Sequence, residues 1–346
     1  MLQGIRFTVA LKSTWSSLGG ILIASLGIAS SGAPVPAVGT AQSVSFRSTG
    51  NPVFEAADPD VLFHAGQFWV YPTGGGPDDR AAFYAFSSPD LKTWTRQGPI
   101  LSFQSVQWIR DDGAPRRFAW APGILHRDGR FYLYFSAGPN TPKPSRIGVA
   151  VAGNPQGPFV DIGRSLLVGS NGFEAIDAKA FEEPGSGRTL LYCGGSAGSK
   201  LRVFELGRDL TSIAREIPVQ NPPRFTEGAF IHHRNRVFYL SYSHGNFRDA
   251  SYSVHYCTSD SATGPWTYQG EILSTDAVHQ GPGHHAIIQR PDTGEWLIFY
   301  HRWNGASRAG KLPARRSVCI ETLQYDADGK ILPVRMTEGL APAHRP

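Results

Sequence analysis

The chain has 346 residues, of which 41% are hydrophobic, 12% aromatic and 18% charged, as in an ordinary globular protein with an ample core. Its 39 glycines and 26 prolines, together with little helical periodicity, predict an all-β protein rich in turns. The formal net charge of +5 is spread along the chain. No basic run is interleaved with aromatic residues, which argues against a nucleic-acid partner.

The first 41 residues differ in kind from the rest of the chain. Arg6 and Lys12 precede an apolar stretch at 18–29, and small residues follow between 33 and 41. This stretch is shorter than the about 20 residues that span a bilayer. The pattern predicts a secretory signal and flexible leader over 1–41, with an uncleaved anchor as the alternative. The mature chain is then expected to have no membrane span and to lie in the extracellular space or periplasm.

Five copies of one hairpin pattern follow the leader. Each copy has a short apolar run, a polar turn and a second, aromatic-rich run, as two paired β-strands do. The copies are DPDVLFHAGQFWVY (58–71), APGILHRDGRFYLY (121–134), DAKAFEEPGSGRTLLY (177–192), RFTEGAFIHHRNRVFYLSY (224–242) and HHAIIQRPDTGEWLIFY (284–300). A strand repeat of about 50 to 60 residues predicts a β-propeller with one blade per copy. We therefore expect a single five-bladed β-propeller from 48 to 340.

One position of the repeat carries an acidic residue in three of the five copies. Aligning the heads of the five copies places together Asp58, Ala121, Asp177, Glu227 and His284. Because the innermost strands of a propeller surround its axis, these residues are expected to meet at one mouth of the channel. Three neighbouring carboxylates shift one another's pKa values. Asp60, on the same face as Asp58 by strand alternation, is an alternative for the first acid.

Trp120 and His284 are further candidates for a site at this mouth. Trp120 can stack on the apolar face of a sugar, or belong to the core. His284 can bind a cation or a water molecule on the axis, or it can have a purely structural role as a hydrogen-bonded side chain. The three cysteines, Cys193, Cys257 and Cys319, lack metal-ligand spacing and lie in predicted strands, so we expect free buried thiols.

Six stretches resemble the five-bladed propellers of glycoside hydrolase family 43, which include arabinofuranosidases, β-xylosidases and arabinanases. They are ADPDV (57–61), WAPGIL (120–125), EAIDAKAF (174–181), FTEGAFIHHRNRVFYLSYS (225–243), GPGHHAIIQRPDTGEWLIFYHRW (281–303) and RSVCIETLQYDADGKILPV (316–334). The resemblance covers about residues 48–340. It implies that Asp58 is the general base, Glu227 the general acid, and Asp177 the residue that tunes the pKa of the acid and orients it.

The resemblance also implies roles for residues around these acids. His284 would support an axial cation or water, so a structural calcium ion at the axis is the one cofactor implied, and the reaction requires none. An arginine at the start of the last long strand would contact the sugar. Arg316 fits this position, and its neighbour Arg315 is the alternative.

The implied activity is hydrolysis of arabinofuranosyl or xylosyl linkages in plant-type polysaccharides or oligosaccharides, by an inverting general acid/base mechanism. Such enzymes hold their acid and base about 6.5–9.5 Å apart. Two alternatives stay open: a carbohydrate-binding propeller without catalysis, and a glycosidase propeller of another family or sugar specificity, such as galactan. The expected partner is carbohydrate, the loops at 102–117 and 244–250 are expected to select the sugar, and the sequence does not predict an oligomeric state.

Overall fold

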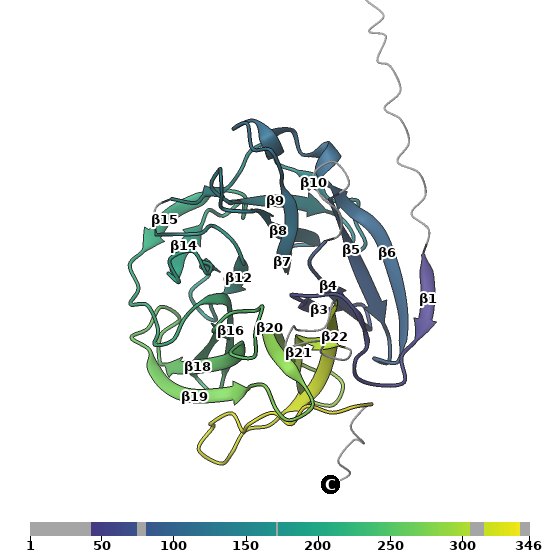
Figure 1. Cartoon of the computed structure of the whole chain (residues 1–346). Coiled ribbons are helices and arrows are strands. Elements are labelled where there is room, and N and C mark those ends of the chain that lie inside the picture. The colour runs from purple at the N-terminus through teal and green to yellow at the C-terminus, as the bar shows by residue number, and fades with distance from the viewer. Residues whose placement is uncertain (1–42, 75–80, 171, 305–314, 340–346) are drawn as a thin grey trace, which may run out of the picture. The chain divides into compact units, whose positions relative to one another are not determined.

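The computed structural model describes residues 43–74, 81–170, 172–304 and 315–339, so the predicted signal at 1–41 lies outside the described residues. Strands make up nearly all of the regular structure, and they form five antiparallel sheets around one axis (Figure 1). The predicted five-bladed β-propeller is confirmed. Within the described ranges, no helix is long and apolar enough to cross a membrane.

The blades follow one another along the chain, and the first strand of each blade lies nearest the axis. From the axis outward, blade 1 has β3 (Asp60–His64), β4 (Gln67–Tyr71), β5 (Ala82–Ser88), β6 (Thr93–Ser102) and, at its outer edge, β1 (Val44–Arg47). Blade 2 has β7 (Phe118–Arg127), β8 (Arg130–Gly138), β9 (Arg146–Ala152) and β10 (Val160–Asp161), with β11 (Leu167–Val168) also paired to β9. Two short 3₁₀ helices, η2 (Phe103–Ser105) and η3 (Gln107–Arg110), connect these two blades.

The remaining blades have four strands each, again from the axis outward. Blade 3 has β12 (Lys179–Glu182), β13 (Thr189–Cys193), β14 (Arg202–Leu206) and β15 (Ile213–Ile217). Blade 4 has β16 (Glu227–Arg234), β17 (Val237–His244), β18 (Ser253–Ser259) and β19 (Thr267–Leu273). Blade 5 has β20 (Gln280–Gln289), β21 (Trp296–Asn304), β22 (Arg315–Leu323) and β2 (Phe54–Glu55).

The second strand of every blade is buried on both faces, because neighbouring sheets pack against it from either side. Fully buried residues of these strands are Val70, Leu133, Leu191, Leu240 and Ile298. A strand covered on both faces is expected to be apolar throughout rather than alternating. This explains the aromatic-rich second run of each sequence repeat. The three cysteines are free and buried, as predicted.

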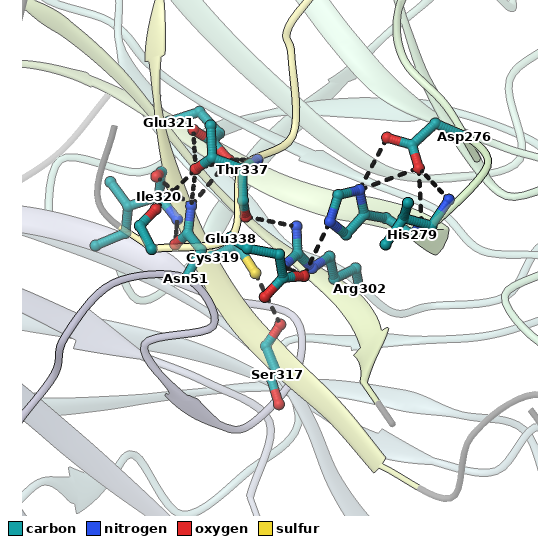
Figure 2. Close-up of polar contacts among 12 residues, drawn as sticks. Asn51, Asp276, His279, Arg302, Ser317, Cys319, Ile320, Glu321, Thr337 and Glu338 are labelled. Atoms are coloured by element: carbon teal, nitrogen blue, oxygen red, sulfur yellow. Dashed lines mark hydrogen bonds and ion pairs between the residues drawn. The ribbon is translucent and has the colours of Figure 1, made fainter. Parts of the chain in front are cut away.

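Blade 5 is completed by the beginning of the chain. Strand β2 pairs antiparallel with β22 through Phe54 with Val318 and Glu55 with Ser317. Just before β2, Asn51 Nδ2 donates to Ile320 O and to Glu321 Oε1, both at 2.8 Å, and Asn51 Oδ1 accepts from Ile320 N at 2.8 Å (Figure 2). The first and last parts of the propeller are thereby fastened to each other.

The C-terminal segment is fixed to the same blade by a polar network (Figure 2). Arg302 Nη2 on β21 donates to Glu338 Oε1 at 2.8 Å. The ring of His279 lies between two carboxylates, with Nε2 2.9 Å from Glu338 Oε1 and Nδ1 2.8 Å from Asp276 Oδ2. Thr337 N donates to Glu321 Oε1 at 2.7 Å. These contacts join the residues after β22 to β21, to β22 and to the residues just before β20.

Candidate active site

Each blade has, on its innermost segment near the channel mouth, one residue in the left-handed backbone region. The five residues and their φ angles are Asp58 (54°), Ala121 (36°), Asp177 (57°), Gly228 (63°) and His284 (39°). Four of them carry a side chain, and a non-glycine residue held in this region costs on the order of 1–3 kcal/mol. Such strained positions cluster at functional sites, and here they surround one channel mouth.

A polar side chain of the preceding blade holds each of these residues in place. The backbone N–H groups donate as follows: Ala121 to Thr73 Oγ1 (2.8 Å), Asp177 to Ser136 Oγ (2.9 Å), Gly228 to Asp177 Oδ2 (3.0 Å), His284 to Ser243 Oγ (2.9 Å) and Asp58 to His301 Nδ1 (3.2 Å). The bonds run around the whole ring. Each left-handed turn is therefore fixed by its neighbour, and the side chains at these turns have little freedom to move.

The alignment of the repeat heads is wrong by one residue in blade 4. Gly228, not Glu227, has the left-handed conformation that Asp58 and Asp177 have, because glycine adopts positive φ without a steric penalty. The strand pairing supports the same shift of one residue. Glu227 pairs with Ser243 immediately before a register shift between β16 and β17. Trp120 pairs with Ser136 immediately before the corresponding shift between β7 and β8. Glu227 is thus equivalent to Trp120, and it reaches the site from a different backbone position than the two aspartates.

The six residues predicted from the sequence line one cavity of about 250 Å³. They are Asp58, Trp120, Asp177, Glu227, His284 and Arg316. The lining also includes Glu174 and Ser196, which sequence reasoning missed. Phe247 and Arg248 line it too, and they belong to the 244–250 loop that is expected to select the sugar. Trp120 packs against Gly138, where an added Cβ would lie 2.0 Å from the indole ring, and it is stacked with Phe118.

Asp58 is surrounded by groups that favour its charged form. Its Oδ2 accepts from Thr73 Oγ1 at 2.5 Å, and its Oδ1 accepts from Arg316 Nη1 at 3.0 Å. Burial by itself would raise the pKa of Asp58, but the charges of Arg316 and His284 and the contact with His301 hold that pKa well below its usual value. The neighbouring Arg315 instead binds Glu55 at 2.7 Å with a side chain that is 70% exposed, so Arg316 is the arginine of the site.

Glu227 is in the opposite situation. Burial raises its pKa to about 7, and the charges of Asp58 and Glu174 act in the same direction. Tyr252 Oη donates to Glu227 Oε1 at 2.8 Å and opposes the shift by stabilising the carboxylate. The Tyr252 ring is fixed between Gly283, where an added Cβ would lie 2.1 Å from it, and the stacked ring of His301. A carboxyl in this setting holds a proton near neutral pH.

Asp177 has a shifted pKa of its own. The resemblance implies that Asp177 tunes the pKa of Glu227. In the structure burial and the charges of Glu227, Asp58 and Glu174 raise the pKa of Asp177 itself well above its usual value. Its Oδ2 accepts from Gly228 N, next to Glu227, so the two carboxyls belong to one titrating pair.

Asp60, the alternative for the first acid, is occupied elsewhere. Lys179 Nζ lies 2.7 Å from both of its carboxylate oxygens. Val61 N and Ile124 N also donate to these oxygens, at 2.9 and 2.7 Å. Asp60 and Lys179 line a second, axial cavity of about 20 Å³ together with His284.

The axial calcium ion remains a prediction that these residues do not support. Calcium takes six to eight oxygen ligands. No group of three or more His, Cys, Asp or Glu in the described ranges is arranged to hold a metal ion. His284 Nδ1 faces Asp58 Oδ1 and Asp177 Oδ2, each at 3.6 Å, and the ammonium of Lys179 already supplies a positive charge at the axis.

The residues that sequence reasoning missed differ in the signal they left. Glu174 stands three residues before Asp177 in the stretch EAID, and this second acid beside a predicted site residue is a signal in the sequence. Thr73, Tyr252 and His301 left no signal in the sequence. Each reaches an acid through a contact that exists only once the strands have packed.

Comparison with known proteins shows which sequences and folds this chain resembles. The β-D-galactofuranosidase xynD of Aspergillus niger is 36% identical over 317 residues, which cover 86% of this chain and 88% of that protein. A xylosidase/arabinosidase of Bacteroides ovatus is 27% identical over 80% of this chain and 94% of its own length. An α-L-arabinofuranosidase structure from Clostridium thermocellum superposes with a TM-score of 0.66 at 28% identity, covering 83% of this chain and 96% of that one.

A second solved structure is a β-xylosidase/α-arabinofuranosidase from a compost microbial metagenome, in complex with xylotriose and in a calcium-free form. It matches with a TM-score of 0.65 at 27% identity over 83% of this chain and 98% of that one. The family model for glycosyl hydrolases family 43 matches residues 49–331, which is most of the chain. The protein belongs to glycosyl hydrolase family 43.

Proposed function

We propose that this protein removes a terminal furanosyl or xylosyl sugar by an inverting mechanism in which Asp58 is the general base and Glu227 the general acid. One observation carries the assignment. Two carboxyls line the same cavity, and their surroundings move their pKa values in opposite directions, downward for Asp58 and to about 7 for Glu227. Two carboxyls whose pKa values differ in this way can act as base and acid at the same working pH.

The reaction follows from these protonation states. Glu227 donates its proton to the oxygen of the leaving group as the glycosidic bond breaks. Asp58 takes a proton from a water molecule, which attacks the anomeric carbon from the opposite face of the sugar. Because the water adds directly, no covalent bond forms between enzyme and sugar, and the product has the inverted configuration.

The other residues of the site position these two acids. Arg316 and Thr73 keep Asp58 charged and oriented. Asp177 accepts from Gly228 N and so fixes the backbone beside Glu227. Trp120 provides an aromatic wall for the apolar face of a sugar.

The size of the cavity favours removal of one terminal sugar. At about 250 Å³ it is below the roughly 300–1,000 Å³ range of pockets for drug-sized ligands. A third cavity, of about 380 Å³, shares Glu227, Ser196, Phe247 and Arg248 with it. The leaving group would extend into this space on the acid side. The names and titles of the relatives indicate D-galactofuranose, L-arabinofuranose and xylose as the candidate sugars.

We further propose that the protein is exported, on the signal-like pattern of residues 1–41. The measurement is the N-terminal sequence of protein recovered from culture medium or periplasm. A mature N-terminus after the apolar stretch supports export, and an intact Met1 on a cell-associated protein contradicts it.

The mechanism is tested by proton NMR of the first-formed sugar and by two isosteric variants. Asp58→Asn is expected to lose activity on every substrate. Glu227→Gln is expected to lose activity on alkyl glycosides by about 10²–10⁴-fold, which is the rate enhancement that general acid catalysis supplies. The same variant should retain most of its activity on dinitrophenyl glycosides, because their leaving group needs no proton. A first product that keeps the substrate's anomeric configuration rejects inversion, and equal losses on both kinds of glycoside reject Glu227 as the acid.

A further inference from the structure

Glu174 is a buried carboxyl in the catalytic cavity to which the proposed mechanism gives no role. It is 6% exposed and lies between β11 and β12, on the segment that leads to Asp177. Burying a carboxylate is costly unless its oxygens are hydrogen-bonded. A buried carboxyl that opens into a substrate cavity therefore needs a reason for its position.

One oxygen of Glu174 is held by the protein. Its Oε2 accepts from Ala197 N at 2.8 Å and from Ser196 Oγ at 3.4 Å, in the loop between β13 and β14. The loop comes this close because residue 195 is glycine, where an added Cβ would lie 2.9 Å from Oε2 and 2.4 Å from Ile176 Cδ1. The carboxyl is thus fixed in one orientation.

The other oxygen is available to a ligand. Among the described residues, none forms a hydrogen bond with Glu174 Oε1, and the side chain lines the catalytic cavity. A carboxylate oxygen has two lone pairs and accepts only. Oε1 therefore fits a ligand that offers one or two hydroxyl donors.

Glu174 faces the terminal sugar rather than the leaving group. It lines the cavity of about 250 Å³ but not the cavity of about 380 Å³ into which the leaving group would extend. Its charge also raises the pKa of Asp177 and of Glu227. Since Asp58 and Glu227 are the groups assigned to the reacting atoms, Glu174 contacts the sugar at a hydroxyl.

We propose that Glu174 is a specificity residue whose Oε1 accepts hydrogen bonds from the exocyclic hydroxyls of a furanosyl sugar, an inference that rests on the proposed function. Galactofuranose carries a two-carbon side chain with two adjacent hydroxyls, which match the two lone pairs of Oε1. Arabinofuranose has the same ring with one exocyclic hydroxyl, and xylopyranose has none. Glu174 therefore favours galactofuranosides over arabinofuranosides, and arabinofuranosides over xylosides.

The test is Glu174→Gln, assayed on 4-nitrophenyl β-D-galactofuranoside, α-L-arabinofuranoside and β-D-xyloside. The amide oxygen keeps the bond to Ala197 N, so the free position changes from an acceptor to an N–H donor of the same size. We expect kcat/KM to fall by roughly ten- to hundredfold on the galactofuranoside, less on the arabinofuranoside, and by the smallest factor on the xyloside. Glu183→Gln, which changes an acid paired with Arg188 in the same blade but outside the cavity, is expected to leave the ratios unchanged.

Comparing substrates separates specificity from a general loss. If Glu174→Gln acted only by changing the pKa of Glu227, it would lower kcat/KM on all three glycosides by the same factor. Equal losses on the three glycosides therefore overturn the inference. A wild-type enzyme that hydrolyses xyloside or arabinofuranoside but not galactofuranoside also overturns it, while the proposed function stands. A wild-type enzyme inactive on all three rejects the proposed function itself.

If Glu174→Gln does not fold, the same hydrogen bond is tested by changing the substrate instead of the enzyme. The wild-type enzyme is compared on 4-nitrophenyl α-L-arabinofuranoside and its 5-deoxy analogue, which lacks only the exocyclic hydroxyl. We expect kcat/KM to be lower for the analogue by roughly tenfold or more. Equal values for the two substrates contradict a hydrogen bond between Glu174 and the side chain of the sugar.

Discussion

Replacing Tyr252 with phenylalanine tests the assignment of Glu227 as the acid through one hydrogen bond. Tyr252 Oη donates to Glu227 Oε1 at 2.8 Å, and this bond stabilises the charged carboxylate. The ring itself is held by Gly283 and by stacking on His301, so Tyr252→Phe removes the hydroxyl without moving the ring. The charged form of Glu227 then loses its main partner, and its pKa rises further.

The size of the effect follows from the strength of the bond. A hydrogen bond to a charged group contributes roughly 1.5–3 kcal/mol, and 1.36 kcal/mol corresponds to one pKa unit. Glu227 acts in its protonated form, so activity falls as pH rises through its pKa, which is about 7. In Tyr252→Phe the alkaline limb of kcat/KM should therefore move upward by about one to two pH units.

The assay is the pH profile of kcat/KM on an alkyl glycoside, for which protonation of the leaving group matters. Tyr134→Phe is the matched control, because Tyr134 is equally buried and donates to Leu210 O at 2.8 Å from blade 2, outside the cavity. Its alkaline limb should stay in place even if its stability falls. An alkaline limb in Tyr252→Phe that stays fixed or moves downward refutes the assignment of Glu227.

Three further predictions concern the base and the axis. Arg316→Ala removes the nearest charge that lowers the pKa of Asp58, so the acid limb of kcat/KM should move to higher pH; an unchanged acid limb would show that another group is the base. Lys179→Met leaves the carboxylate of Asp60 buried without its partner. The free energy of unfolding, measured by urea denaturation, should fall by about 3–5 kcal/mol. The double variant Lys179→Met/Asp60→Asn should recover part of this loss, because it also removes the unpaired charge. Because Lys179 supplies the axial charge, dialysis against EDTA should leave the Tm unchanged, and a fall that calcium reverses would contradict this.

The repeat pattern was sufficient to predict the blades. Strands such as QFWVY and TLLYC have a strong preference for buried sheet, and each is bounded by turn residues. The five hairpins and the all-β class depend on residues that are close together in the sequence. The convergence of the acids on one mouth follows from the repeat of this pattern around a common axis.

What sequence reasoning missed depends on contacts between distant residues. The one-residue error at Glu227 arose because acids were aligned with acids, while the backbone conformation placed Gly228 at the equivalent position. The raised pKa of Asp177 depends on burial and on Glu174 and Glu227 together, which no single motif reveals. Tyr252 reaches Glu227 across strands of blade 4.

The fastening of β2 onto β22 has a consequence for how activity develops during folding. Asp58 follows β2 directly, whereas the groups that set its charge, His301 and Arg316, belong to β21 and β22 near the other end of the chain. Contacts between such distant segments form late, because the intervening chain must first be ordered. A chain that has folded its middle blades but not joined its ends has no ionised, oriented base. Recovery of hydrolysis during refolding therefore reports the joining of the two ends, while recovery of strand content reports the earlier folding of single blades.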